Sequence, residues 1–336
     1  MIDKTIARLF DGHDLSRAEA REAMGEIMDG EATREQIAGF LVALRDKGET
    51  ADEIAGCAEA MREHVLVVTP QREDLVDTAG TGGDGMRTLN ISTAAALVAA
   101  AAGAGVAKHG NRAASSQTGS ADVLEALGFE LELPPEKIAR SIDELGFGFM
   151  FAQAHHPAMR HAAPVRRELG TRTIFNILGP LTNPARARAQ VVGVYSEQLV
   201  RPIAEALAQL GSHRAFVVHG AGGIDELSPV GPSVVCEVTD GGVRDQIIDP
   251  DDFGIERCTV EELRGGTPAE NADAIRRVFA GERGGKREAI LLNAAGAFAA
   301  AGHAEGIRDA LEPVREALDS GAAAARLEAL VEFSRS

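Results

Sequence analysis

A short apolar strand and a glycine-rich turn are predicted within residues 75–93, which read LVDTAGTGGDGMRTLNIST. Glycines placed directly after a strand let successive backbone N–H groups converge, an arrangement that favours phosphate oxygens. Asn90 or Ser92 can cap the helix expected next, so the free N–H groups of that helix face the same space. The Ser92 and Thr93 hydroxyls add donors or a metal ligand. A tight turn followed by an ordinary helix cap uses the same residues, so this stretch alone leaves both interpretations open.

Two known glycine motifs do not fit this turn. Residues 80–85 formally match G-x-G-x-x-G, but in dinucleotide-binding proteins the helix opens inside the glycines and an acidic residue follows about 20 positions later. Here residues 86–89 intervene, and Gly-Val-Ala-Lys occupies 105–108. A Walker A loop is excluded as well, because Met86 and Arg87 follow the last glycine in place of Lys-Ser/Thr.

The composition indicates a globular protein with an acidic surface. The chain has 336 residues, 34 basic and 51 acidic side chains and a net charge of −17. At roughly 150 residues per domain, about two domains are expected. A negative field disfavours sequence-independent nucleic-acid binding and adhesion to anionic membranes, so we expect neither partner.

Other features indicate a cytoplasmic protein. The longest apolar run, residues 94–107, is shorter than the ~18 residues of a membrane span, and we expect it to be one buried element. The N-terminus lacks the pattern of a secretory signal. Cys57, Cys236 and Cys258 are widely spaced, which predicts reduced thiols rather than a disulfide framework or a zinc site.

Four short helices are predicted in the first 66 residues, and a break at Pro70 predicts a domain boundary. Gly30 and Gly48 are expected helix stops. Three capping boxes mark helix starts: Ser16 with Glu19, Thr33 with Gln36, and Thr50 with Glu53.

After Pro70, short β-rich runs alternate with helical stretches, as in an α/β sheet. A capped helix is expected from Thr267 to Phe279, and Ala-rich helices at 287–335 would cover the sheet. Strands are predicted at 75–77, 147–151, 190–195 and 215–219, and a hairpin with an Asp240-Gly241 turn joins 234–238 to 243–248.

A second polar segment, residues 108–120, reads KHGNRAASSQTGS directly after the apolar run. Two cations, a histidine, an asparagine and several hydroxyls lie within thirteen residues. Such density is unusual for a solvated loop between two helices. Together the two loops could bind a ligand with two separated phosphate groups.

Two further clusters are candidates. Residues 155–172 concentrate histidines and arginines, most of which are expected to be packing or surface residues, although one inward arginine would bind a carboxylate. Asp225 and Glu226 follow a predicted strand, where they become plausible Mg²⁺ ligands. The chain lacks G-x-S-x-G and His-Glu-x-x-His, so hydrolase and zinc-enzyme hypotheses have no motif.

Taken together, these motifs resemble the anthranilate phosphoribosyltransferase family over nearly the whole chain. The motifs are residues 80–84, 90–93, 108–116, 119–122, 155–159, 173–184 and 225–226. The resemblance implies transfer of the phosphoribosyl group from phosphoribosyl pyrophosphate to the amine of anthranilate, the second step of tryptophan biosynthesis. It also implies a homodimer and a nucleoside phosphorylase/phosphoribosyltransferase-like α/β fold with a central mixed sheet flanked by helices. Residues 1–70 with about 165–185 would form a small helical domain, and 71–164 with 186–336 the larger domain.

The resemblance also implies roles for individual residues, although no single catalytic residue. Gly80, Asn111 and Arg166 would meet anthranilate, and Ser92, Asp225 and Glu226 would hold two Mg²⁺ ions. The phosphoribosyl pyrophosphate site would comprise Gly80, Gly83, Asp84, Thr88, Asn90, Ile91, Ser92, Thr93, Lys108, His109, Gly110, Asn111, Arg112, Ala113, Ala114, Ser115, Ser116 and Ser120.

Two positions depart from the family pattern. Similar proteins often have a basic residue where Gln117 stands and proline where Gln153 stands. We expect these differences to change local loop shape more than activity.

Three alternatives remain open at this point. A pyrimidine nucleoside phosphorylase resembles the family in fold, but residues 108–112 and Asp225-Glu226 speak against it. A non-catalytic nucleic-acid-binding relative would have a basic face and would lack the carboxylate pair. An anion-sensing regulator without turnover is the third.

Overall fold

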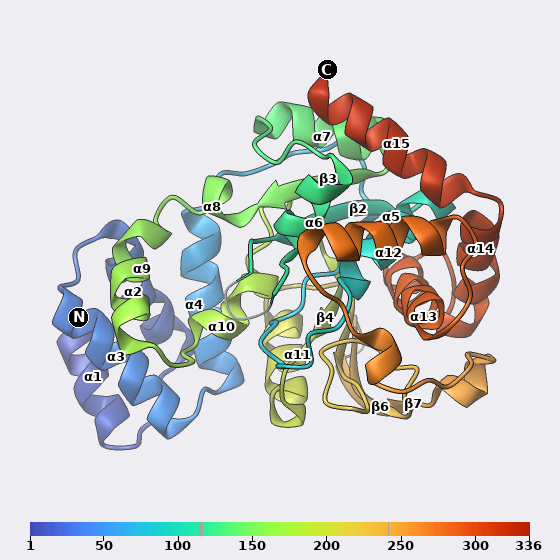
Figure 1. Cartoon of the computed structure of the whole chain (residues 1–336). Helices are drawn as coiled ribbons and strands as arrows, with labels where there is room; N and C mark the ends of the chain where they lie inside the picture. The colour runs from blue at the N-terminus through green and yellow to red at the C-terminus, as the bar shows by residue number, and fades with distance from the viewer. Residues whose placement is uncertain (114–116, 241) are drawn as a thin grey trace.

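The computed structural model describes residues 1–113, 117–240 and 242–336. It consists of a helical part beside a larger α/β part (Figure 1). The helical part contains α1 (Ile2–Phe10), α2 (Arg17–Asp29), α3 (Arg34–Lys47), α4 (Ala51–Glu63), α9 (Met159–Leu169) and the short α10 (Phe175–Leu178). Helices α9 and α10 return to this part after the first three strands of the sheet, and they pack against α2, α3 and α4.

The predicted starts and stops of the first helices are confirmed. Ser16, Thr33 and Thr50 each accept from the backbone N–H three residues later, and the Glu or Gln at that position accepts in return. Gly30 adopts the left-handed conformation that ends α2, and Gly48 ends α3. These caps depend only on neighbouring residues, which is why the sequence is sufficient to locate them.

Seven strands form one mixed sheet in the order β3-β2-β1-β4-β5-β6-β7. The first five positions are parallel, and β6 and β7 are antiparallel to their neighbours. The strands are β1 (Leu75–Asp77), β2 (Gly105–Gly110), β3 (Phe147–Phe151), β4 (Ala189–Gly193), β5 (Arg214–His219), β6 (Ser233–Thr239) and β7 (Gly242–Ile248). The mixed sheet and the hairpin are as predicted, although Gly241 of its turn lies outside the described residues.

The expectation of a single buried element at 94–107 is wrong. Helix α5 (Ile91–Ala102) ends at Gly103, whose φ of +120° is disfavoured for other residues. The chain then enters β2, which pairs with β1 and β3. Lys108, His109 and Gly110 therefore belong to a buried central strand rather than to a loop.

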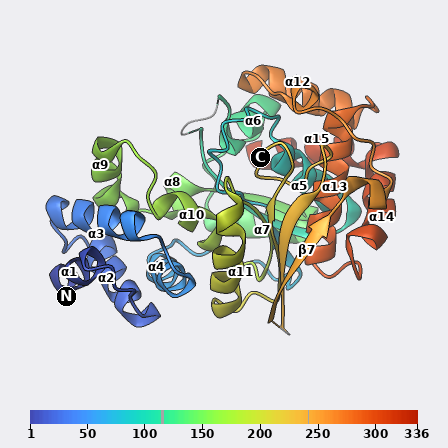
Figure 2. The ribbon, with the colours of Figure 1, turned by 90° about the horizontal axis from the view of Figure 1, so that it is seen from below.

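The remaining helices belong to the larger part, and several of them flank the sheet. Helices α5, α13 and α14 pack together on one face, and α11 packs against β5 and β6 on the other (Figures 1 and 2). These helices are α6 (Ser120–Leu127), α7 (Pro135–Leu145), α8 (Ala152–His155), α11 (Val200–Gln209), α12 (Pro268–Phe279), α13 (Gly285–Ala300), α14 (Ile307–Asp319) and α15 (Ala322–Arg335), with 3-10 turns η1 (Gly179–Leu181), η2 (Glu197–Leu199), η3 (Pro250–Phe253) and η4 (Glu261–Leu263).

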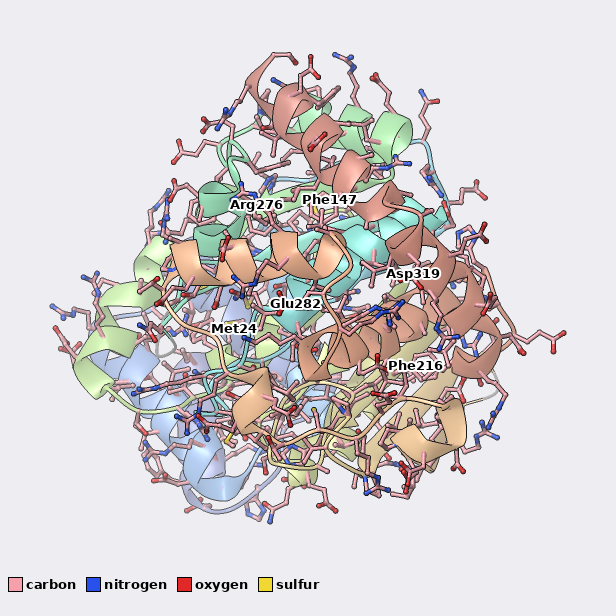
Figure 3. The ribbon with its side chains drawn as sticks, turned by 45° about the vertical axis from the view of Figure 1, so that its right-hand side comes forward. Met24, Phe147, Phe216, Arg276, Glu282 and Asp319 are labelled. Carbon is pink, nitrogen blue, oxygen red and sulfur yellow. The ribbon has the colours of Figure 1, made fainter. Side chains whose placement is uncertain are left out.

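Two apolar cores result from the alternation of side chains along the strands. Phe147 and Phe216 lie in the core beneath α5 and α13, whereas Met24 lies in the helical part (Figure 3). Val217 of β5 faces the opposite way from Phe216 and joins the core that contains Met24. The helical part thus shares its core with one face of the sheet.

The strand order gives a point between β1 and β4 at which the connections diverge. The connection that leaves β1 runs to β2 on one side, and the connection that leaves β4 runs to β5 on the other. Ligands of α/β proteins bind at the carboxyl ends of strands where connections diverge in this way. The glycine turn after β1 lies at this point.

Candidate active site

The glycine turn after β1 requires its glycines. Gly82, Gly83 and Gly85 have φ of +62°, +77° and +77°, which other residues rarely adopt. The Asp84 side chain accepts from Met86 N at 3.0 Å within the turn. The predicted glycine loop is therefore present as a sharply folded backbone rather than as an extended linker.

Two other glycines lie where Asp225 approaches the backbone too closely to leave room for a side chain. A Cβ at Gly80 would lie 2.9 Å from Asp225 Oδ2, and one at Gly193 would lie 1.5 Å from the Asp225 carbonyl oxygen. Asp225 Oδ2 also accepts from Gly82 N at 2.8 Å. The structure thus brings Gly80, the glycine turn and Asp225 together at the ends of β1, β4 and β5.

Asn90, one of the two predicted caps, stands at the N-cap position of α5, but its side chain makes no capping hydrogen bond. Its amide donates to Thr118 O at 3.0 Å, and its carbonyl accepts from Asn271 Nδ2 at 2.9 Å. The first turn of the helix instead faces a carboxylate, because Ser92 N donates to Glu226 Oε1 at 3.2 Å. The buried Thr93 hydroxyl has no hydrogen-bond partner among the described residues.

The carboxylates at this edge repel one another. Burial raises the pKa of Asp225 to about 7, with further contributions from the charge and hydrogen bonding of Asp84. Burial and the neighbouring Asp225 raise the pKa of Glu226 well above its usual value. A cation at this place would relieve the repulsion and would favour the ionised forms.

These residues suit Mg²⁺ by their chemistry. Carboxylate oxygens are hard donors, and Mg²⁺ is commonly held by one or two carboxylates together with water and substrate phosphates. Within residues 1–113, 117–240 and 242–336, no group of three or more His, Cys, Asp or Glu side chains is arranged to hold a metal ion. Asp225 and Glu226 could therefore supply at most part of a coordination shell, with the remaining positions taken by water or a bound ligand.

Lys108 lies under this edge rather than on its surface. The residue is 1% exposed, and Nζ donates to the Thr78 carbonyl and hydroxyl oxygens at 3.1 and 3.0 Å. Burial lowers the pKa of Lys108, against the attraction of Asp77 and Glu226. Burial raises the pKa of Asp77 to about 6, against the attraction of Lys108.

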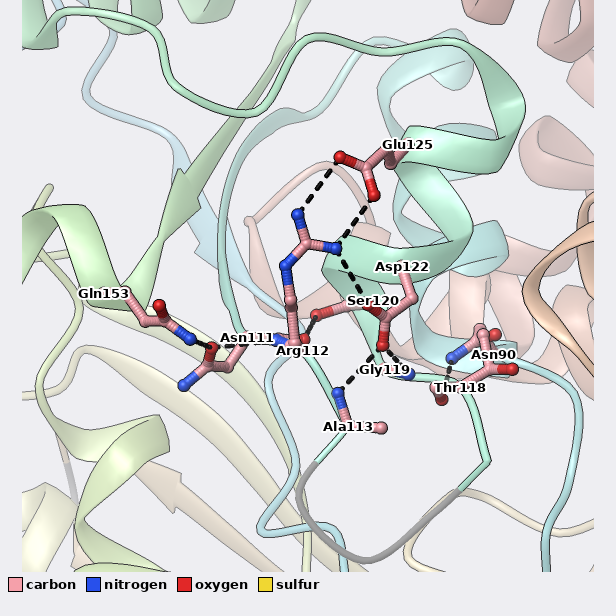
Figure 4. Close-up of polar contacts among 10 residues, drawn as sticks. All are labelled: Asn90, Asn111, Arg112, Ala113, Thr118, Gly119, Ser120, Asp122, Glu125 and Gln153. Atoms are coloured by element: carbon pink, nitrogen blue, oxygen red, sulfur yellow. Dashed lines mark hydrogen bonds and ion pairs between the residues drawn. The ribbon is translucent and has the colours of Figure 1, made fainter. Parts of the chain in front are cut away.

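The second predicted loop begins directly after β2. Asn111 Oδ1 accepts from Arg112 N at 2.8 Å and from Gln153 Nε2 at 3.4 Å (Figure 4). The Ser120 hydroxyl donates to the Asn111 carbonyl oxygen at 3.3 Å. The Arg112 guanidinium is paired with Asp122 and Glu125 of α6. Ala114, Ser115 and Ser116 lie outside the described residues.

Histidines form a buried contact beside this loop. His109 Nε2 lies 3.1 Å from His156 Nε2, and His109 Nδ1 contacts Gly179 O at 3.2 Å. Burial lowers the pKa of His156 to about 4 and that of His109 well below its usual value. His155 is buried too and bonds Leu66 O at 2.8 Å, in agreement with the packing role predicted for most of these histidines.

The arginines of the helical part divide into two kinds. Arg166 is half-buried on α9, its guanidinium stacks 5.0 Å from the Phe175 ring, and burial lowers its pKa. Arg172 is exposed, as expected, and its guanidinium bonds the Gly83 carbonyl oxygen and stacks 4.0 Å from the Tyr195 ring. Arg172 thus links the helical part to the glycine turn, a contact that no local sequence signal predicts.

Other predicted residues have identifiable places. Thr88 forms an isolated antiparallel bridge with Arg264. Gln117 is exposed. In the described part of the chain, no helix is both long enough and apolar enough to span a bilayer.

Comparison with known proteins agrees with this geometry. Residues 4–65 match the model for the glycosyl transferase family, helical bundle domain, and residues 72–324 match that for the glycosyl transferase family, a/b domain. Anthranilate phosphoribosyltransferase of Symbiobacterium thermophilum is 52% identical, over 98% of this chain and 96% of the relative.

Solved structures agree as well. Anthranilate phosphoribosyltransferase of Thermus thermophilus superposes with a TM-score of 0.93 at 50% identity, over 98% of this chain and 99% of the other. The Saccharomyces cerevisiae enzyme in complex with PRPP and Mg gives 0.90 at 28% identity, over 99% and 98%. The nucleoside phosphorylase and nucleic-acid-binding alternatives are set aside by these matches. The chain belongs to the anthranilate phosphoribosyltransferase family.

Proposed function

We propose that the chain transfers the phosphoribosyl group of phosphoribosyl pyrophosphate (PRPP) to the amine of anthranilate and releases pyrophosphate. The observation that carries the proposal is the meeting of three features at one sheet edge. These are the glycine turn, the start of α5 and the carboxylates Asp225 and Glu226. Each suits a diphosphate with its cation.

The chemistry requires stabilisation of the leaving group. Displacement at the anomeric carbon places positive charge on the ribose and negative charge on the departing pyrophosphate. Backbone N–H groups of Gly83, Asp84 and the first turn of α5 would donate to the pyrophosphate oxygens. When bound, Mg²⁺ would neutralise charge on the diphosphate, and Asp225, Glu226 and Ser92 are the residues that would hold it.

Lys108 would act from the protein interior, beneath the site formed by the glycine turn and Asp225. Its ammonium group is fixed by Thr78 and lies in the field of Asp77 and Glu226. We infer that it offsets part of the carboxylate charge rather than contacting the donor at the surface. Ala113 to Ser116 and Ser120 would complete the donor site from the second loop.

Anthranilate is expected beside the helical part. Its aromatic amine is neutral at pH 7, so the reaction needs alignment more than a strong base, an effect that can contribute roughly 7–11 kcal/mol. Arg166 would bind the anthranilate carboxylate, with Asn111 and Gly80 as neighbours. Arg166 suits this role because its half-buried guanidinium forms no ion pair with the described residues.

Four finer points belong to the same proposal. The site would hold two Mg²⁺ ions, the reaction would be the second step of tryptophan biosynthesis, and the protein would act as a homodimer in the cytoplasm. Exposed apolar residues of the helical part, Phe10 among them, are suited to a subunit contact.

A fluorescence assay tests the proposal. Purified protein is mixed with anthranilate, PRPP and Mg²⁺, and loss of anthranilate fluorescence is followed. We expect decay that requires all three components and that is strongly reduced in Asp225→Asn but not in Asp273→Asn, an exposed carboxylate on α12. Absence of decay in the wild-type protein would refute the proposed function.

A further inference from the structure

The segment between η4 and α12 lies against the first donor-binding loop. Leu89 N donates to Leu263 O at 2.8 Å, and Gly265 N donates to Arg87 O at 2.9 Å. Thr88 lies between these two contacts and bridges to Arg264. Residues 87–89 are therefore held by a segment far along the chain, which contains none of the residues assigned to the donor site in the sequence analysis.

Asn271, at the start of α12, extends this support to Asn90. The residue is 2% exposed, its Oδ1 accepts from Gly266 N at 2.7 Å and its Nδ2 donates to Asn90 Oδ1 at 2.9 Å. Asn90 in turn donates from Nδ2 to Thr118 O at 3.0 Å. Both polar atoms of the Asn90 amide are thus engaged, and the two donor-binding loops are joined through it.

Asp122, on the first turn of α6, closes the second loop (Figure 4). One carboxylate oxygen, Oδ2, accepts from Ala113 N and from Gly119 N, both at 2.9 Å. The other, Oδ1, accepts from Arg112 Nη1 at 3.0 Å. Burial opposes the charge of Asp122, but these donors outweigh burial and lower its pKa.

The base of this loop leaves no room for a side chain. A Cβ at Gly119 would lie 2.4 Å from Ala113 N and 2.6 Å from Asn111 O. The two ends of the loop therefore touch, and Asp122 supplies the hydrogen bonds that hold them. Thr118, next to this closure, is the residue that Asn90 contacts.

We infer that Asp122 and Asn271 are positioning residues for the sugar donor: Asp122 closes the loop after β2, and Asn271 orients the Asn90 amide that ties this loop to the start of α5. The inference rests on the proposed function, because both loops are assigned to PRPP. Neither residue needs to touch the donor. Their effect is to fix the separation between the donors of one loop and those of the other.

The connection between the two loops depends on the orientation of the Asn90 amide, so it is sensitive to a change of hydrogen-bonding group at Asn271. In Asn271→Asp, a carboxylate oxygen would face Asn90 Oδ1, and the two acceptors would repel. If the Asn90 amide turned over to donate to the introduced carboxylate, its carbonyl oxygen would then face Thr118 O. Either arrangement removes one of the two contacts, although the new side chain has almost the same shape.

The test compares the isosteric variants Asn271→Asp and Asp122→Asn with two controls. Asp273→Asn makes the same charge change as Asp122→Asn at an exposed position of α12, and Glu125→Gln weakens the Arg112 ion pair without touching the loop closure. Steady-state kinetics give KM for PRPP, KM for anthranilate and kcat. Thermal unfolding and hydrogen exchange at the Ala113 and Gly119 amides are measured on the same proteins.

We expect KM for PRPP to rise at least fivefold in Asn271→Asp and Asp122→Asn, with KM for anthranilate within twofold of wild type. Hydrogen exchange at Ala113 and Gly119 should accelerate in Asp122→Asn while the midpoint of thermal unfolding changes little. Unchanged KM for PRPP in both variants, or equal increases of both KM values, would overturn the inference and leave the proposed function standing. A wild-type protein without turnover would overturn both.

Discussion

Lowering the pH should destabilise the fold through His156, by an amount that the structure allows to be worked out. His156 is 8% exposed, and burial lowers its pKa from 6.5 to about 4. In the unfolded chain it has its ordinary pKa of about 6.5. The neutral form is therefore favoured by folding, and its stabilising contribution is complete above pH 6.5 and is lost as the pH falls toward 4.

The magnitude follows from the two pKa values. One pKa unit corresponds to about 1.36 kcal/mol, so the full effect is about 3 kcal/mol, and about 2 kcal/mol of it is already lost at pH 5. Asp77 acts in the opposite direction, because burial raises its pKa to about 6 and its protonation favours the folded state. The pH dependence of the wild-type protein alone therefore does not isolate His156.

A variant isolates the effect. His156→Gln retains a side-chain amide that can donate to His109 Nε2 but cannot take up a proton. The free energy of unfolding is measured in urea at pH 7 and pH 5 for both proteins. We expect the free energy of unfolding to fall by about 2 kcal/mol more in the wild type than in the variant when the pH is lowered from 7 to 5. An equal change in both proteins would show that His156 is not held neutral by burial, and would refute the reasoning.

Three other predictions concern the site and the helical part. Arg166→Ala should raise KM for anthranilate at least tenfold and KM for PRPP less than twofold in steady-state kinetics, and equal increases would remove the assigned role. Gly193→Ala should reduce kcat/KM more than 100-fold, because the added Cβ would displace the Asp225 backbone, whereas Gly25→Ala, with no atom within 4 Å, should retain activity. Thr50→Ala should lower the free energy of unfolding in urea by about 1 kcal/mol through loss of the α4 cap, and no change would contradict the observed capping box.

The sequence predicts the helical part better than the sheet. Capping boxes act within four residues, so Ser16, Thr33 and Thr50 locate their helices without tertiary information. Strand β2 is missed because Gly105, Val106 and Ala107 continue the apolar run of α5. A central parallel strand is buried on both faces, so it lacks the alternation that would distinguish it from a buried helix.

In the site too, features set by neighbouring residues can be predicted from the sequence, whereas contacts between distant residues cannot. The glycine turn and the Asp225-Glu226 pair are recognisable because adjacent residues carry their chemistry. The roles of Arg172 and Asn271 cannot be recognised from the sequence. Arg172 contacts Gly83, which lies 89 positions away, and Asn271 contacts Asn90, which lies 181 positions away. A lone arginine after a helix, or an asparagine in the first turn of another, has many ordinary explanations until the fold brings its partner near.

Several departures from ordinary protein architecture lie near the carboxyl ends of β1, β4 and β5, where the donor site is proposed. Arg87 has a φ of +54° although it is not glycine, and the Thr93 hydroxyl is buried without a partner among the described residues. The ionised forms of Asp225 and Glu226 are destabilised, because both carboxylates are buried close to another carboxylate. Each feature costs stability in the free protein, and such costs persist where a ligand removes them. A diphosphate with its cation would lower the cost at the carboxylates, because the cation brings positive charge to Asp225 and Glu226.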